Sequence, residues 1–239
     1  MITPAPRNTT VFSHHRETIQ PEFVVPDLAL DVQQKMDGLV LLNKLPANSV
    51  PLVFFDPQYR SVLARQSYGN EGKRHKKRME LPQMTNETIH EFIAEIERSL
   101  MPSGHLMLWV DKYIVVSGVH SLLEGSTLQP VDMITWNKSR MGMGYRTRRF
   151  SEYLIVLQKA PLRAKGVWKS HSIPDVWTEK IDKNDRSHTH AKPIGLQKTL
   201  IECVTNIGDI VVDPCAGSYS VMKAALAVER HFIGCDLLE

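Results

Sequence analysis

The fold of this chain is decided by the stretch Gly208-Asp209-Ile210-Val211-Val212-Asp213-Pro214-Cys215-Ala216-Gly217-Ser218-Tyr219. Its apolar run predicts a buried strand that ends at Asp213 and enters a tight turn of small residues. A helical pattern through residues 224–226 follows, and then a second short strand over residues 231–236 that ends in an acid. Strand, glycine turn, helix, strand and terminal acid form the nucleotide-binding half of an open α/β sheet. The dinucleotide spacing G-x-G-x-x-G is absent, which favours a nucleoside ligand without a pyrophosphate.

A second motif, the tetrapeptide Asp56-Pro57-Gln58-Tyr59, directly follows an apolar run. An acid, a rigid proline and an aromatic at the end of a strand suit a flat ring that carries an amine. Asp56 can accept hydrogen bonds from the amine, and Tyr59 can stack on the ring. Proline removes a backbone donor, so this turn presents carbonyl groups to its ligand. The tetrapeptide alone is also typical of ordinary turns, because Asp-Pro begins turns well.

The remaining periodicities predict a mostly parallel, doubly wound α/β sheet with one antiparallel edge hairpin. Expected helices begin at Thr85 or Asn86, run over residues 115–123, and begin at Pro193, where proline suits a first turn. Expected strands lie at residues 105–110, 131–136 and 154–157, of which the last two form the hairpin. The chain of 239 residues suffices for one such domain. Residues 1–34 are predicted to be a loose N-terminal arm, and residues 35–239 a single domain.

Composition points to a reducing compartment and to no membrane insertion. The three cysteines, Cys203, Cys215 and Cys235, are widely spaced among core-like residues and are predicted to be buried thiols. No apolar run approaches the roughly 20 residues of a membrane span, and the first residues do not resemble a signal peptide. We therefore expect a cytoplasmic protein. His188 and His190 have no carboxylate or cysteine at ligand spacing, so no metal site is predicted.

Basic residues gather in two loop-like stretches although the formal net charge is only +3. The first stretch lies within the loop predicted over residues 60–84, directly after the tetrapeptide, and the second lies between two predicted strands. Such residues neutralise phosphates and give sequence-independent affinity for nucleic acid. The candidate DNA-binding residues are Arg60, Arg65, Lys73, Arg74, Lys76, Lys77, Arg78, Lys138, Arg140, Arg146, Arg148 and Arg149.

Five ordered segments resemble the beta-class amino-methyltransferases of DNA, which carry a D-P-P-Y catalytic motif first and a D-P-F-x-G-x-G cofactor motif last. The two motifs above stand in that order. The other matches are residues 39–50, Trp136-Asn137-Lys138 with residues 152–157, and His190-Ala191-Lys192-Pro193 with Leu196, Leu200 and Ile201. The resemblance runs from Asp37 to Asp236. It implies a seven-stranded Rossmann-like methyltransferase sheet, S-adenosylmethionine as cofactor and DNA as partner; it leaves a homodimer open.

The resemblance also implies the site residues. The catalytic residues are Asp56, Pro57, Gln58 and Tyr59, and Asp236 takes the cofactor's ribose. The remaining cofactor-binding residues are Asp213, Pro214, Cys215, Ala216, Gly217, Ser218, Tyr219, Lys192 and Pro193. Three residues depart from the family pattern: Gln58 replaces a proline, Cys215 a phenylalanine and Tyr219 a glycine. A side chain at residue 219 is expected to narrow the pocket or to change the path of the loop.

The reaction implied is transfer of a methyl group to the N6 amine of adenine, with the base flipped out of the duplex and stacked on Tyr59. Residues 160–189 fall where the family has its target-recognition region, and their small number predicts a short or relaxed recognition site. A cytosine-N4 methyltransferase remains an alternative, since the acid favours adenine without proving it. A catalytically inactive DNA-binding relative is a second alternative, because of the three departures. Methylation of RNA or of a protein glutamine is disfavoured by the order of the motifs.

Overall fold

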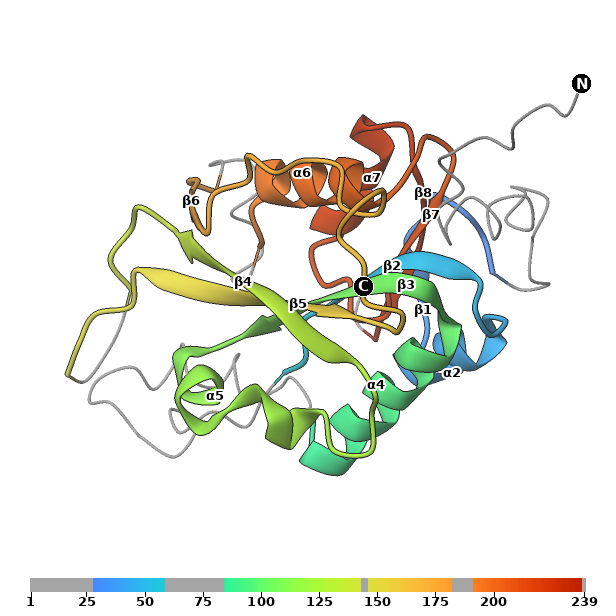
Figure 1. The fold of residues 1–239 in the computed structure, drawn as a ribbon, viewed down its shortest axis with the longest axis horizontal. Coiled ribbons are helices and arrows are strands. Elements are labelled where there is room, and N and C mark those ends of the chain that lie inside the picture. The colour runs from blue at the N-terminus through green and yellow to red at the C-terminus, as the bar shows by residue number, and fades with distance from the viewer. Residues whose placement is uncertain (1–27, 59–83, 143–145, 182–190, 238–239) are drawn as a thin grey trace, which may run out of the picture.

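The computed structural model describes residues 28–58, 84–142, 146–181 and 191–237, which form one sheet of eight strands with helices around it (Figure 1). The strand order is β1-β8-β7-β2-β3-β5-β4-β6. Every neighbouring pair is parallel except the two pairs that β5 makes, with β3 and with β4. The strands are β1 (Gln34–Lys35), β2 (Val50–Phe55), β3 (Leu100–Val110), β4 (Gln129–Asn137), β5 (Ser151–Gln158), β6 (Val176–Thr178), β7 (Ile210–Asp213) and β8 (His231–Asp236).

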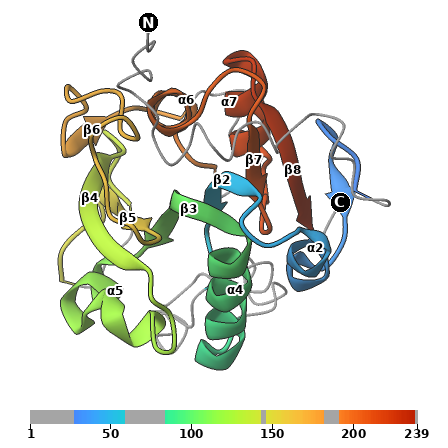
Figure 2. The ribbon, with the colours of Figure 1, turned by 45° about the vertical axis from the view of Figure 1, so that its right-hand side comes forward.

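Helices cover both faces of this sheet (Figures 1 and 2). One face carries α2 (Gly38–Lys44), α4 (Asn86–Ser99), α5 (Lys112–Ser117) and a short 3-10 helix, η2 (Val119–Leu122); the other carries α6 (Ile194–Val204) and α7 (Ser220–Ala227). Strand β2 lies between the two layers. Its Leu52 and Phe54 join the α6 and α7 core, and Val53 and Phe55 join the α2 and α4 core. A parallel strand buried on both faces is typical of doubly wound α/β folds, so the predicted fold class is confirmed.

The sheet differs from the prediction at three places. The antiparallel pair β4 and β5 forms as predicted, but β6 adds to β4, so eight described strands replace the expected seven and the hairpin is not at the very edge. Strand β3 begins at Leu100 and not at residue 105 as predicted; its pairing with β2 has a register shift, and Ser103 within it is left-handed (φ 62°). The helix expected over residues 115–123 is two short helices, broken at Gly118, whose φ is 94°.

The predicted domain boundary at residue 35 is too late, because residues 28–34 are packed against the rest of the sheet. Leu28 is only 2% exposed and lies in the α2 and α4 core. Asp31 accepts hydrogen bonds from the backbone N–H of Phe232 and pairs with His231, both at 2.8 Å. Gln34 then pairs with β8. Within residues 28–34 the predicted arm is therefore part of the domain; its earlier residues lie outside the described part of the chain.

Three further predictions concern cysteines, membranes and metals. All three cysteines are free thiols; Cys203 and Cys235 are buried as predicted, whereas Cys215 is only partly buried. Among the helices of the described ranges, none has the length and apolar character needed to cross a bilayer. In the same ranges no group of three or more histidine, cysteine or acidic side chains is arranged to bind a metal ion.

Candidate active site

Three aspartates meet at one edge of the sheet. Asp213 is the last residue of β7, Asp236 is the last residue of β8, and Asp56 directly follows β2. These strands are parallel neighbours, so their carboxyl ends lie at the same edge, which is where open α/β sheets bind ligands. The two motifs, which are far apart in the sequence, are thus brought together by the pairing of β2 with β7.

The pKa of Asp213 is strongly raised. Its side chain is buried, and this burial, together with the nearby charges of Asp56 and Asp236, raises its pKa to about 8. The backbone N–H of Cys215 donates to its carboxylate at 3.0 Å and, with Lys192, opposes the shift. Asp213 is therefore largely protonated near pH 7, and the negative charge at this edge comes from Asp56 and Asp236, which favours a positively charged ligand.

The turn after β7 is fixed against β8. The Ala216 N–H donates to the Cys235 carbonyl, and the Gly217 N–H donates to the Asp236 carboxylate, both at 2.9 Å. Gly217 has a φ of 48°, and a Cβ built on it would meet no atom within 4 Å. The glycine therefore leaves open space beside the terminal acid, as the nucleoside-binding pattern predicts.

Tyr219 stands where the family pattern has a glycine. Its backbone is left-handed (φ 54°), a conformation that favours glycine. Its side chain packs edge-to-face on Phe232 and is 7% exposed, and its hydroxyl donates to the Gln34 carbonyl at 2.9 Å. Tyr219 thus ties the turn to β1 through the core.

Helix α2 approaches the same turn closely at Gly38, a contact that the sequence patterns did not indicate. A Cβ on Gly38 would stand 2.3 Å from the Pro214 carbonyl oxygen, so only glycine fits there. Asp37 caps this helix by accepting from the N–H groups of Leu39 and Val40. The signal in the sequence was an acid followed by a glycine at a helix start.

Lys192 forms an ion pair with Asp56. Its Nζ is 2.9 Å from the Asp56 carboxylate and 2.8 Å from the carboxylate of Glu152, on β5. Glu152 also pairs with Lys138 at 3.0 Å. The two lysines hold the pKa of Glu152 at about 2, despite burial that acts in the opposite direction. Glu152 appeared in the sequence only as part of a resembling segment, and its role needed the tertiary structure to be seen.

The remaining residues predicted to be catalytic or DNA-binding fall into three groups. Tyr59 and the first basic stretch lie outside the described residues. Pro57 is buried, whereas Gln58 is exposed and accepts the Met84 N–H through its carbonyl at 3.0 Å. In the second basic stretch Lys138 is paired with Glu152, and the exposed cations are Arg140, Arg146 and Arg148.

Arg149 is the fourth arginine of that stretch. Its Nη2 is buried and has no hydrogen-bond partner among the described residues. It lines a cavity of about 130 Å³ with Lys112, Arg148 and the paired Lys138 and Glu152. An unpaired guanidinium nitrogen in a mostly cationic cavity suits an anionic group.

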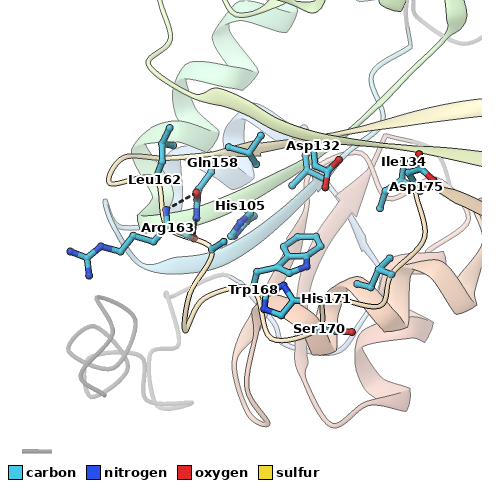
Figure 3. A pocket seen from close by; sticks show the side chains of 14 residues that line it. His105, Asp132, Ile134, Gln158, Leu162, Arg163, Trp168, Ser170, His171 and Asp175 are labelled. Atoms are coloured by element: carbon cyan, nitrogen blue, oxygen red, sulfur yellow. Dashed lines mark hydrogen bonds between the residues drawn. The ribbon is translucent and has the colours of Figure 1, made fainter. Parts of the chain in front are cut away.

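A larger cavity, of about 440 Å³, contains none of the predicted catalytic or cofactor residues (Figure 3). His105, in the middle of β3, and Trp168 line it, with their ring centroids 5.8 Å apart. Burial lowers the pKa of His105 to about 4, so the imidazole is neutral near pH 7. This cavity does not contribute to the three-aspartate edge.

Comparison with known proteins gives a consistent set of relatives. A family model described as DNA methylase matches residues 50–239. The chain is 53% identical over 208 residues to the type II methyltransferase M.HhaII of Haemophilus parahaemolyticus, covering 86% of this chain and 90% of that one. It is 28% identical over 238 residues to the DNA adenine methyltransferase YhdJ of Escherichia coli K12, with coverages of 84% and 76%.

Solved structures show the same fold. The complex of M1.HpyAVI with S-adenosylmethionine superposes with a TM-score of 0.61 at 19% identity, covering 87% of this chain and 93% of that one. The PvuII DNA methyltransferase, which is cytosine-N4-specific, gives a TM-score of 0.63 at 14% identity, with coverages of 86% and 81%.

Proposed function

Because this chain belongs to the DNA methylase family, we propose that it transfers a methyl group from S-adenosylmethionine to the N6 amine of adenine in DNA. The observation that carries the proposal is that Asp56 stands at the same sheet edge as the Asp213 turn and Asp236. The relative YhdJ, named as an adenine methyltransferase, supports the choice of base. The fold likeness to a cytosine-N4 enzyme does not decide against it, because identity there is only 14%.

The residues present fit the cofactor. Its sulfonium is a cation, and the negative region formed by Asp56 and Asp236 beside the buried Asp213 is suited to hold one. The open space beside Gly217 admits a nucleoside close to the backbone, and Asp236 lies next to it to accept ribose hydroxyls. The bound cofactor supplies an electrophilic methyl group whose leaving group is a neutral thioether.

The protein's own part in the reaction is to align and polarise the amine. The lone pair of an exocyclic aromatic amine is delocalised into the ring. Hydrogen bonds from the amine to the Asp56 carboxylate and to the Pro57 carbonyl localise that pair toward the methyl group. As the nitrogen forms its bond to carbon it becomes more acidic, and it then transfers one proton to the Asp56 carboxylate, which is 35% exposed and passes the proton to solvent. Lys192 keeps a positive charge beside this carboxylate throughout.

Access to the base and to the DNA backbone completes the proposal. A base inside a duplex cannot reach the sheet edge, so the adenine is flipped out. The second basic stretch and the cavity at Arg149 supply phosphate contacts. We assign target recognition to residues 160–189; in their described part, only the three-residue β6 is regular structure. A recognition segment of this size contacts few base edges, so the recognised DNA sequence is short or the specificity is relaxed.

The test is to incubate the protein with labelled S-adenosylmethionine and unmethylated DNA, digest the DNA to nucleosides and identify the labelled one. Label in N6-methyladenine is expected. Asp56→Ala should lose it, whereas Asp132→Ala, an exposed aspartate on β4, should keep it. Label in N4-methylcytosine would overturn the substrate. DNA binding without any label would favour the inactive relative, and calorimetry with the cofactor would then show whether its site is intact.

A further inference from the structure

A row of four charged side chains crosses the active edge of the sheet. We call Lys138, Glu152, Lys192 and Asp56 the charged row. They come from the end of β4, from β5, from the residue before Pro193 at the start of α6, and from the end of β2. Their signs alternate, and the successive nitrogen–oxygen distances are 3.0, 2.8 and 2.9 Å. Each inner member therefore has an opposite charge on both sides.

Two tryptophans form the floor beneath the lysines of this row. The Lys192 Nζ lies 4.9 Å from the ring centroid of Trp109, and the Lys138 Nζ lies 5.9 Å from that of Trp136. The two rings pack edge-to-face, 5.9 Å apart, and both are almost fully buried. An aromatic face attracts a cation and restricts the paths open to its side chain. The two tryptophan rings thus restrict where the two lysine side chains can lie above the sheet.

Two acidic partners stabilise the charged form of Lys192 against the effect of burial. Its side chain is 11% exposed, and burial by itself lowers the pKa of a lysine. Here Asp56 and Glu152 together raise it above its usual value. Glu152 is in turn anchored in β5, which lies inside the sheet between β3 and β4. By contrast, the side chain of Asp56 is 35% exposed and stands at the end of a strand.

We propose that Lys192 is a positioning residue for Asp56, held in place by Glu152 and Lys138. This inference rests on the proposed function. The Asp56 carboxylate must meet the amine within hydrogen-bond distance, and a lysine fixed on two sides restricts the orientations that this carboxylate can adopt. The family resemblance placed Lys192 in the cofactor site, which predicts something different. A positioning residue slows the methyl-transfer step, whereas a cofactor ligand weakens cofactor binding.

The test compares Lys192→Met, Lys192→Arg and Glu152→Gln with Lys198→Met, a matched lysine six residues later on α6. Misplacement of a catalytic group by about 1 Å can cost on the order of 100-fold in rate. We expect kcat to fall by roughly that factor in Lys192→Met and by a smaller factor, about 10-fold, in Glu152→Gln. Lys192→Arg should recover part of the loss. The KM for the cofactor and its calorimetric Kd should change less than about 3-fold.

A second measurement does not depend on activity. Unfolding of Asp56→Asn, Lys192→Met and the double variant by urea forms a double-mutant cycle, and the two substitutions should be non-additive. Loss of cofactor binding in Lys192→Met, with kcat intact at saturation, would overturn the proposal, as would additive unfolding or activities equal to that of Lys198→Met. An inactive wild type that still shows non-additive unfolding would instead count against the proposed function.

Discussion

At the scale of single residues, Asp213 shows how one position serves both stability and binding. The turn needs its carboxylate to accept the Cys215 N–H, yet the site is buried and lies near two other acids. The fold therefore holds an acid where its ionised form is disfavoured. A cation bound at this edge would relieve that cost, which explains why the residue is compatible with a site for a sulfonium.

This conflict predicts a pH dependence of stability. An aspartate in the unfolded chain ionises near pH 3.8, whereas the folded pKa is about 8. Between these values the folded state retains a proton that the unfolded state releases, so the free energy of unfolding falls as pH rises across this window. The contribution is at most about 1.4 kcal/mol per pH unit.

Urea unfolding of the ligand-free protein from pH 4 to pH 8 checks this prediction. In Asp213→Asn the free energy of unfolding should fall less as the pH rises, and it should exceed that of the wild type by the largest amount near pH 8. Equal pH dependence in the two proteins would show that Asp213 titrates normally. Glu152, whose folded pKa is about 2, and His105, whose folded pKa is about 4, act with the opposite sign below about pH 4.5 and about pH 6.5, respectively. Both groups are present in the two proteins, so their contributions cancel in the comparison.

At the scale of elements, the start of α6 depends on a side chain from another segment. Pro193 stands at the N-cap and has no side chain that can cap the helix. Glu179, which follows β6, supplies the cap instead, because its carboxylate accepts from the N–H groups of Gly195 at 2.8 Å and Leu196 at 3.0 Å. Its carbonyl accepts from the indole of Trp136 at 2.9 Å. Glu179 thus joins the end of β6, the floor of the charged row and the helix that follows Lys192.

Glu179→Ala should therefore destabilise the protein and slow the reaction. The loss of a helix N-cap costs about 1 kcal/mol. Because Lys192 precedes this helix, kcat should also fall, by roughly 3- to 10-fold. Glu179→Gln retains one acceptor oxygen and should have a smaller effect on both. Urea midpoints together with steady-state kinetics measure the two effects, and unchanged values in the alanine variant would show that Pro193 suffices to begin the helix.

At the scale of the whole molecule, a small net charge hides an uneven distribution. The chain carries a formal charge of +3. At the carboxyl end of the parallel strands, acids gather around the turn after β7, while the exposed Arg140, Arg146 and Arg148 follow β4. One part of this edge therefore suits a cation and the other a polyanion. This separation lets a single surface hold a sulfonium and a nucleic acid backbone at the same time.

The arginines predict a salt-dependent affinity for DNA that does not depend on sequence. Replacing Arg146 or Arg148 with Gln should weaken binding to unrelated duplexes equally, and each should reduce the slope of log K against log salt concentration by about 1. Fluorescence anisotropy titrations between low and physiological salt measure this slope. Lys198→Gln provides the control. A variant that weakens binding to one sequence only would identify a base contact.

The fold class, the two motifs and the family could be predicted from the sequence alone, because strand and turn patterns are local and a buried parallel strand is a run of consecutive apolar residues. Local patterns also placed Asp56, Asp213 and Asp236 at strand ends. The packing of Leu28 and β1, the Glu179 cap and the charged row are visible only in the folded protein. Glu152 and Lys192 are 40 residues apart and meet only after β5 has inserted between β3 and β4. Contacts of this kind depend on strand order, which no local periodicity encodes.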